Sequence, residues 1–208
     1  MAIDTWLAFA AASAVLLVIP GPTILTVISY SVTHGRSAAI PLIVAVALGD
    51  STALALSLVG LGSLLATSAL AFTIVKWLGG AYLIYLGVRM LRAGVAAAAE
   101  TTSSAPATSR WKLFANTYAV TATNPKGIIF FMAFLPQFVD PHADVARQMW
   151  ILAVTFVVLA IVNATLYTVF AGYAASLLAS DRARRWFNFG GGSLLSAAGF
   201  FTLLARRI

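Results

Sequence analysis

Pro20-Gly21-Pro22 and Asn124-Pro125-Lys126-Gly127 interrupt two apolar runs of the chain near their middles, at corresponding places in its two halves. A proline inside a membrane helix removes a backbone donor and clashes with the preceding turn, so nearby carbonyl groups need other partners. In secondary transporters, two broken helices meet near the bilayer midplane, where their ends bind the substrate and the coupling ion. The paired breaks therefore predict a small membrane transporter. The alternative is that the prolines only kink packed helices.

Composition places the chain in a lipid bilayer. Of its 208 residues, 61% are hydrophobic and 9% are charged, and the mean hydropathy is +0.95. A water-soluble domain needs a more polar surface than this. The net charge of +7 does not indicate a nucleic-acid partner, because the basic residues mostly lie singly or in small groups beside apolar runs.

Six apolar runs are long enough to cross the bilayer, since a spanning helix needs roughly 20 residues. We expect an all-α membrane protein with six transmembrane helices, of which the first and fourth are broken. The runs cover residues 5–30, 38–66, 69–91, 113–138, 146–179 and 187–205.

The chain divides into two halves of three runs each. We expect a first half at 1–92, a flexible cytoplasmic linker at 93–112, rich in Ala, Ser and Thr, and a second half at 113–208. Three spans per half make the second half enter the membrane in the opposite direction, as in a 3+3 inverted-topology repeat. A lone polar residue in the second and fifth runs, Asp50 and Asn163, supports this symmetry.

Basic residues are concentrated in alternate connections. By the positive-inside rule, the odd-numbered connections are cytoplasmic and both termini lie outside the cytoplasm. The odd connections contain Arg36, then Arg89, Arg92, Arg110 and Lys112, then Arg182, Arg184 and Arg185, whereas the opposite side has Arg147, Arg206 and Arg207.

Each break favours the start of a new half-helix. Asn124 is a good N-cap residue and Pro125 suits the first helical position, and Gly21 with Pro22 can act in the same way. A helix start presents unpaired N–H groups and about half a positive charge, which suits a substrate carboxylate. Lys126 adds a full positive charge that must face a partner, a cavity or the substrate.

Asp50 is the only acidic residue expected at membrane depth. One hypothesis makes Asp50 both the proton carrier and the ligand of a substrate ammonium. The alternative is a structural salt bridge between Asp50 and Lys126. A zwitterion fits this pair of charges better than a cation, so we expect a small neutral amino acid as substrate.

Other classes of function fit the residues less well. A rhomboid-like protease would need a Gly-x-Ser-Gly motif and a histidine at membrane depth, and neither is present. The absence of cysteine and of any His, Asp or Glu cluster with ligand spacing predicts no metal and no cofactor. We therefore expect no enzyme activity. A passive channel for a small solute or ion remains an alternative, because broken helices also build pores.

Glycines on the third and sixth runs predict close helix contacts. Gly79, Gly80 and Gly87 lie on the third run, and Gly192 with Ser196 on the sixth. The pattern leaves open whether such a face also forms a homodimer.

Several motifs occur in an order that resembles the lysine exporter (LysE/RhtB) family, over nearly the whole chain. The resemblance implies export of amino acids such as threonine, homoserine or leucine across the bacterial cytoplasmic (inner) membrane, by proton antiport. It also favours a ligand role for Lys76, whose long stem otherwise suits an interfacial anchor. The chain departs from the family at Thr23, where relatives often have Asn or Asp. The motifs are Pro20-Gly21-Pro22, Gly49-Asp50, the stretch 76–87 (KWLGGAYLIYLG), Asn124-Pro125-Lys126-Gly127 and Leu135-Pro136-Gln137-Phe138.

Overall fold

The computed structural model describes residues 1–67, 69–92, 109–140 and 142–204, and regular structure in this part of the chain is helical throughout. In the first half, the helices are α1 (Ile3–Val18), α2 (Pro22–His34), the short 3₁₀ helix η1 (Gly35–Ala38), α3 (Ala39–Thr67) and α4 (Ala69–Arg92). In the second half, they are α5 (Arg110–Ala122), α6 (Pro125–Ile129), the π-helix η3 (Phe130–Phe134), the 3₁₀ helix η4 (Leu135–Phe138), α7 (Val145–Val169), α8 (Ala171–Ala179) and α9 (Asp181–Leu204).

The structure is that of an all-α membrane protein. By length and composition, three described helical runs can cross a membrane: Pro22–Gly60, Val145–Val169 and Asp181–Leu204. Helix α1 is apolar but shorter. The count of six spans stays a prediction.

The helix boundaries follow the apolar runs with three differences. The fifth run is divided, because α7 ends at Val169 and α8 begins at Ala171. The last helix begins at Asp181, earlier than the expected residue 187. Helix α5 begins at Arg110, inside the stretch expected to be a linker, and residues 93–108 lie outside the described part.

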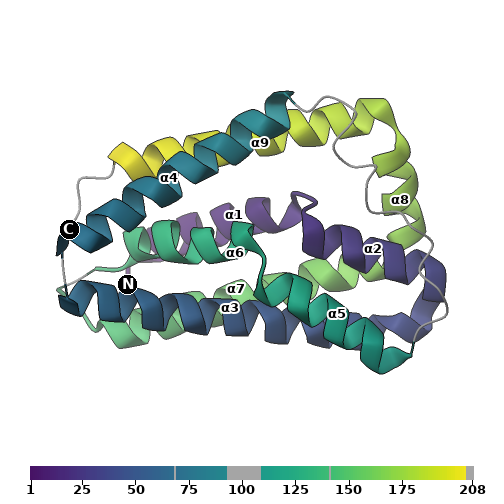
Figure 1. Cartoon of the computed structure of the whole chain (residues 1–208), viewed down its shortest axis with the longest axis horizontal. Helices are drawn as coiled ribbons and strands as arrows, with labels where there is room; N and C mark the ends of the chain where they lie inside the picture. Colours follow the sequence, from purple (N-terminus) through teal and green to yellow (C-terminus); the bar gives the residue numbers. More distant parts are fainter. Residues whose placement is uncertain (68, 93–108, 141, 205–208) are drawn as a thin grey trace.

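Helices from the two halves pack against each other (Figure 1). Helix α3 lies against α5 and α7, α1 lies against α7, and α4 forms its most extensive contact with α9. Two pairs of glycines allow the close approach of α4 and α9. A Cβ atom added at Gly199 would lie 2.6 Å from the oxygen of Gly80, and one added at Gly192 would lie 2.6 Å from the oxygen of Gly87. The predicted close contact of these glycine faces is confirmed.

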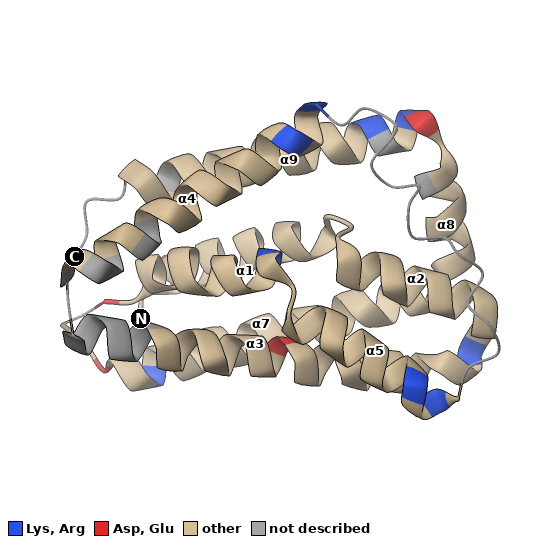
Figure 2. Ribbon diagram, viewed as in Figure 1, with Lys and Arg blue, Asp and Glu red and all other residues tan. Residues whose placement is uncertain are grey.

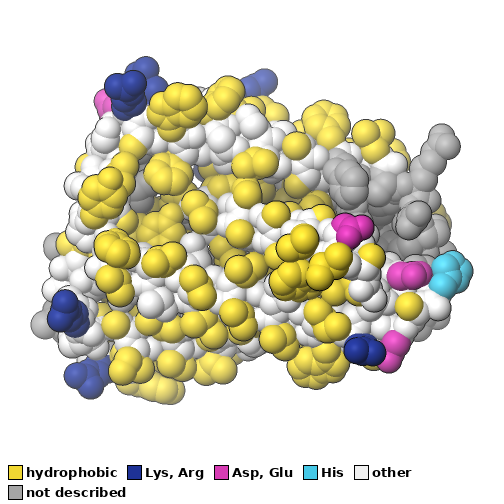
Figure 3. Space-filling view, turned by 180° about the vertical axis from the view of Figure 1, so that it is seen from behind, with side chains coloured by type: hydrophobic (Ala, Val, Ile, Leu, Met, Phe, Trp, Pro, Cys, Tyr) yellow, Lys and Arg dark blue, Asp and Glu magenta, His cyan; other side chains and the backbone are white. Residues whose placement is uncertain are grey.

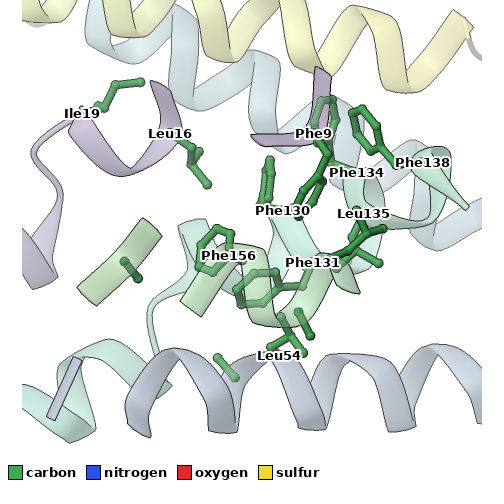
Figure 4. Close-up of a cluster of buried hydrophobic side chains, with 14 of the residues drawn as sticks. Phe9, Leu16, Ile19, Leu54, Phe130, Phe131, Phe134, Leu135, Phe138 and Phe156 are labelled. Carbon is green, nitrogen blue, oxygen red and sulfur yellow. The ribbon is translucent and has the colours of Figure 1, made fainter. Parts of the chain in front are cut away.

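Phenylalanines fill the centre of the largest hydrophobic core (Figure 4). The rings of Phe131 and Phe156 meet edge to face, with centroids 4.7 Å apart. Phe9 of α1 makes a similar contact with Phe138 of η4 at 5.4 Å. These contacts join α1 of the first half to the segment η3–η4 and α7 of the second half, so the core connects the two halves.

Charged residues lie mainly at the two ends of the helix bundle (Figure 2). Lys and Arg gather mostly at the end where α2, α5 and α8 lie, which has Arg36, Arg110 and Lys112. Two charged residues have buried or half-buried side chains: Asp50 in the interior of α3, and Lys126 in the first turn of α6.

Candidate functional site

Both breaks occur where the sequence predicts them. Helix α1 ends at Val18, and α2 begins at Pro22 with Gly21 as its N-cap. Helix α5 ends at Ala122, and α6 begins at Pro125. Proline is tolerated at the first position of a helix because that position needs no backbone donor. Each motif therefore ends one helix and starts the next.

Asn124 joins the two breaks. Its side-chain oxygen accepts a hydrogen bond from the backbone N–H of Lys126 at 3.1 Å, which caps α6. Its side-chain nitrogen donates to the hydroxyl of Thr23 at 3.1 Å, in the first turn of α2. Asn124 and Thr23 are both buried. The starts of the two half-helices are therefore tied together by one amide side chain.

Three side chains of the second half hold the end of α1. The last carbonyl groups of a helix have no partner within it, and those of α1 find their partners in side chains of other helices. Lys126 Nζ donates to the carbonyl oxygens of Leu16 at 3.0 Å and Ile19 at 2.9 Å. Asn163 Nδ2 donates a hydrogen bond to Leu17 O at 3.1 Å, and the Tyr167 hydroxyl donates one to Val18 O at 2.8 Å.

This arrangement also places charge favourably. The carbonyl end of a helix carries about half a negative charge, so a cation is stabilised there. Lys126 lies against the carbonyl end of α1 and provides that cation. We define Lys126, Asn163 and Tyr167 as the α1 clamp.

Asp50 lies close to these groups without pairing with them. It lines the same cavity as Lys126, yet no ion pair within 4.0 Å joins the two. Within the described residues, Lys126 Nζ bonds only to main-chain oxygens, and no side chain donates a hydrogen bond to Asp50. The structure therefore does not show the salt bridge that the sequence left as an alternative.

Gly49 explains why Asp50 comes so near the second break. A Cβ atom at this position would lie 2.6 Å from Cβ of Thr121 and 3.2 Å from the backbone nitrogen of Ala122. Only glycine lets α3 pass this close to the end of α5. The Gly49-Asp50 dipeptide thus combines a close helix contact with a carboxylate one residue later.

A small cavity lies between the two breaks. Its volume is about 30 Å³, which is the share of one water molecule in liquid water. A molecule of the size of an amino acid is several times larger than this volume. The lining comprises Leu16, Leu17, Gly21, Thr23, Ile24, Val46, Asp50, Asn124, Lys126, Gly127, Phe156, Ala160 and Asn163.

Most of the predicted site residues meet at this cavity. Pro20, Pro22 and Pro125 shape the backbone and do not line it. Lys76 lies in α4, and its side chain falls outside the described residues. Tyr167 was not among the predicted site residues, although it stands four residues after Asn163, on the same face of α7. That these residues bind a substrate stays a prediction.

An all-α membrane protein in which two broken helices meet around a small cavity with charged and polar side chains in its wall belongs, by its fold and its site, to the class of membrane transporters. A family model described as LysE type translocator matches residues 14–206. The chain belongs to the LysE type translocator family, as its motifs led us to expect.

Curated relatives match nearly the whole chain. A homoserine/homoserine lactone efflux protein of Salmonella typhimurium is 35% identical over 206 residues, which cover 99% of each chain. An uncharacterized membrane protein of Vibrio cholerae is 32% identical over 99% of this chain and 100% of that protein. A leucine efflux protein of Klebsiella pneumoniae is 29% identical over 74% of this chain and 73% of its own length. No solved structure matches the chain.

Proposed function

We propose that this protein exports small neutral amino acids from the bacterial cytoplasm across the inner membrane, by antiport with protons. The observation that carries the proposal is the position of Asp50 and Lys126, which line one cavity where two broken helices meet. The names of the relatives, which refer to homoserine, homoserine lactone and leucine, support amino acids of this kind.

The two charges suit the two ends of a zwitterion. Lys126 Nζ has three N–H donors, of which the α1 carbonyl groups use two. The third donor, together with the positive end of α2, suits a carboxylate. Asp50, which accepts no hydrogen bond from a described side chain, suits the ammonium group. Leu16, Ile24 and Phe156 offer apolar surface for the side chain.

Proton coupling follows from the single carboxylate. Asp50 binds either a proton or the substrate ammonium, so the two travel in opposite directions across the membrane. A buried carboxylate that binds neither a proton nor an ammonium group is costly at this depth. This cost disfavours a change of the transporter from one orientation to the other while Asp50 is ionised and the site is empty. One acidic group is enough for this exchange.

We propose that the basic end of the molecule faces the cytoplasm. Most described Lys and Arg residues gather at the end where α2, α5 and α8 lie, whereas Arg147 lies at the start of α7 (Figure 2). The positive-inside rule then puts the described N-terminus outside the cytoplasm.

A 3+3 inverted repeat accounts for the helix contacts. In this proposal, α1 and α2 correspond to α5 and α6, α3 corresponds to α7, and α4 corresponds to α9. Each broken helix then packs on the unbroken helix of the other half, as α1 does on α7 and α5 does on α3. The glycine-paired helices α4 and α9 are the third equivalent pair.

Uptake into inside-out membrane vesicles tests this function. We expect threonine, homoserine or leucine to accumulate when a proton gradient is imposed, and Asp50→Asn to abolish that accumulation. Asp4→Asn is the control, because Asp4 is an exposed acidic residue in the first turn of α1. Better competition by lysine or arginine than by these neutral amino acids would contradict the zwitterion proposal. Flux that neither saturates nor depends on the gradient would favour the channel alternative instead.

A further inference from the structure

An apolar groove runs between α1 and α9, on the side of α1 away from the candidate site. Its volume is about 800 Å³. A second groove of about 370 Å³ continues it towards the phenylalanine core, and the two share Val15, Ile19 and Leu194. Figure 3 shows a hollow lined by hydrophobic side chains near the end where basic residues gather.

One mouth of the groove is basic. Arg182 lines it and also lines an adjoining depression of about 620 Å³, together with Arg185, Trp186 and the acidic Asp181. The two arginines outnumber the single carboxylate there, so the charge of the depression is positive on balance. Both arginines lie in the first turns of α9, where the helix dipole disfavours a cation. The helix dipole therefore does not stabilise these two arginines, whereas a bound anion would stabilise them. Trp186 is 69% exposed, as is typical of a ring at the level of the lipid headgroups.

The groove has the length of one acyl chain. From Arg182 to Leu194, α9 rises about 18 Å at ~1.5 Å per residue. The hydrocarbon region is about 30 Å thick, so this distance reaches roughly to the bilayer midplane. A lipid whose phosphate lies at Arg182 would place its chain along Val18, Ile19 and Gly191.

We propose that this groove is a binding site for an anionic phospholipid, with one acyl chain between α1 and α9 and the phosphate at Arg182 and Arg185. Arginine forms two parallel hydrogen bonds with phosphate oxygens, and basic residues beside a membrane attract anionic headgroups. A second copy of the chain fits less well. In a symmetric dimer the same surface meets itself, so the arginines of both copies would be brought to one interface.

Brominated lipids test the site, because bromine in an acyl chain quenches the fluorescence of a tryptophan that it contacts. The full-length chain is reconstituted in phosphatidylcholine vesicles with a minor fraction of brominated phosphatidylglycerol, or of brominated phosphatidylcholine in matched vesicles. The difference between the unmodified protein and Trp186→Phe isolates the signal of Trp186. From the quenching, we expect phosphatidylglycerol to be enriched about fivefold or more around Trp186, relative to its fraction in the vesicle.

Charge variants identify the headgroup contact. Arg182→Gln with Arg185→Gln should remove the preference for phosphatidylglycerol, and Arg147→Gln at the start of α7 should keep it. Circular dichroism checks that each variant is folded, and the single variant Arg182→Gln replaces the double variant if that one unfolds. Equal quenching by the two lipids would overturn the proposal. A second result would also overturn it: neither lipid quenches Trp186, and two copies of the chain can be cross-linked through the faces that carry Trp186.

Discussion

Lys126 contributes both to the candidate site and to the fold. It supplies positive charge to a polar cavity, and it satisfies two carbonyl groups that the break in α1 leaves without helical partners. The cost of a cation at this depth is offset by these two charge-assisted hydrogen bonds. The residue is therefore part of the fold as well as part of the candidate site.

Lys126→Met should weaken the fold and abolish transport. The methionine keeps most of the volume and leaves Leu16 O and Ile19 O without a donor, so we expect a loss of about 1–3 kcal/mol in the free energy of unfolding. Denaturant unfolding of the purified protein measures this loss. Lys112→Met is the control, since Lys112 is exposed on α5. Unchanged stability and transport in Lys126→Met would show that neither role is correct.

At the scale of the element, the end of α1 separates two spaces. Leu17 lines the candidate cavity, whereas Val18 lines the apolar groove on the other side and Ile19 lines both grooves. Leu16 lies between these spaces, because it lines both the candidate cavity and the second groove. The α1 clamp attaches this end to α6 and α7. The end of α1 therefore forms part of the wall of a cavity of about 30 Å³, and the α1 clamp holds that wall in place.

Tyr167→Phe should loosen the α1 clamp without removing any group that we propose to touch the substrate. The chain has no cysteine, so Ala160→Cys places a single thiol in the cavity wall. Loss of one hydrogen bond at membrane depth, worth about 0.6 kcal/mol on average, should raise the labelling rate of this thiol about threefold. Tyr173→Phe in α8 is the matched control, because Tyr173 is exposed.

A labelling rate that stays the same in Tyr167→Phe would show that the hydroxyl does not restrain α1. An equal rise in the Tyr173→Phe control would indicate general loosening of the fold. Circular dichroism of both variants separates local opening from partial unfolding. Asn163 belongs to the same clamp, but it also lines the cavity, so its substitution is less informative.

The elements differ in how far the sequence predicts them. The breaks were predictable because proline and asparagine act locally, through a missing donor and a side-chain cap. The bond from Tyr167 to Val18 was not, because it joins residues that only the packing of α7 on α1 brings together. The division at Phe170 and the π-helix at Phe130–Phe134 also lack a proline or glycine at the irregular position.

At the scale of the whole molecule, the site is formed by both halves together. Thr23 and Asp50 come from the first half, and Asn124, Lys126 and Asn163 come from the second. Hydrophobic periodicity predicts where each run lies but not which run lies beside which, so the sequence alone suggested this meeting only through the symmetry of the two breaks. Helix packing across the halves brings those breaks together.

The direction in which the chain enters the membrane can be tested with single cysteines at its two ends. Ser37 in η1 and Ala143 before α7 are both exposed, and no native thiol interferes. If the basic end is cytoplasmic, a membrane-impermeant thiol reagent should label Ala143→Cys in intact cells and Ser37→Cys only in inside-out vesicles. Labelling of both from one side would contradict an odd number of crossings between them, and so the six-span topology. The reverse pattern would preserve the fold but invert the positive-inside assignment, and the vesicle orientation used to measure export would then have to be exchanged.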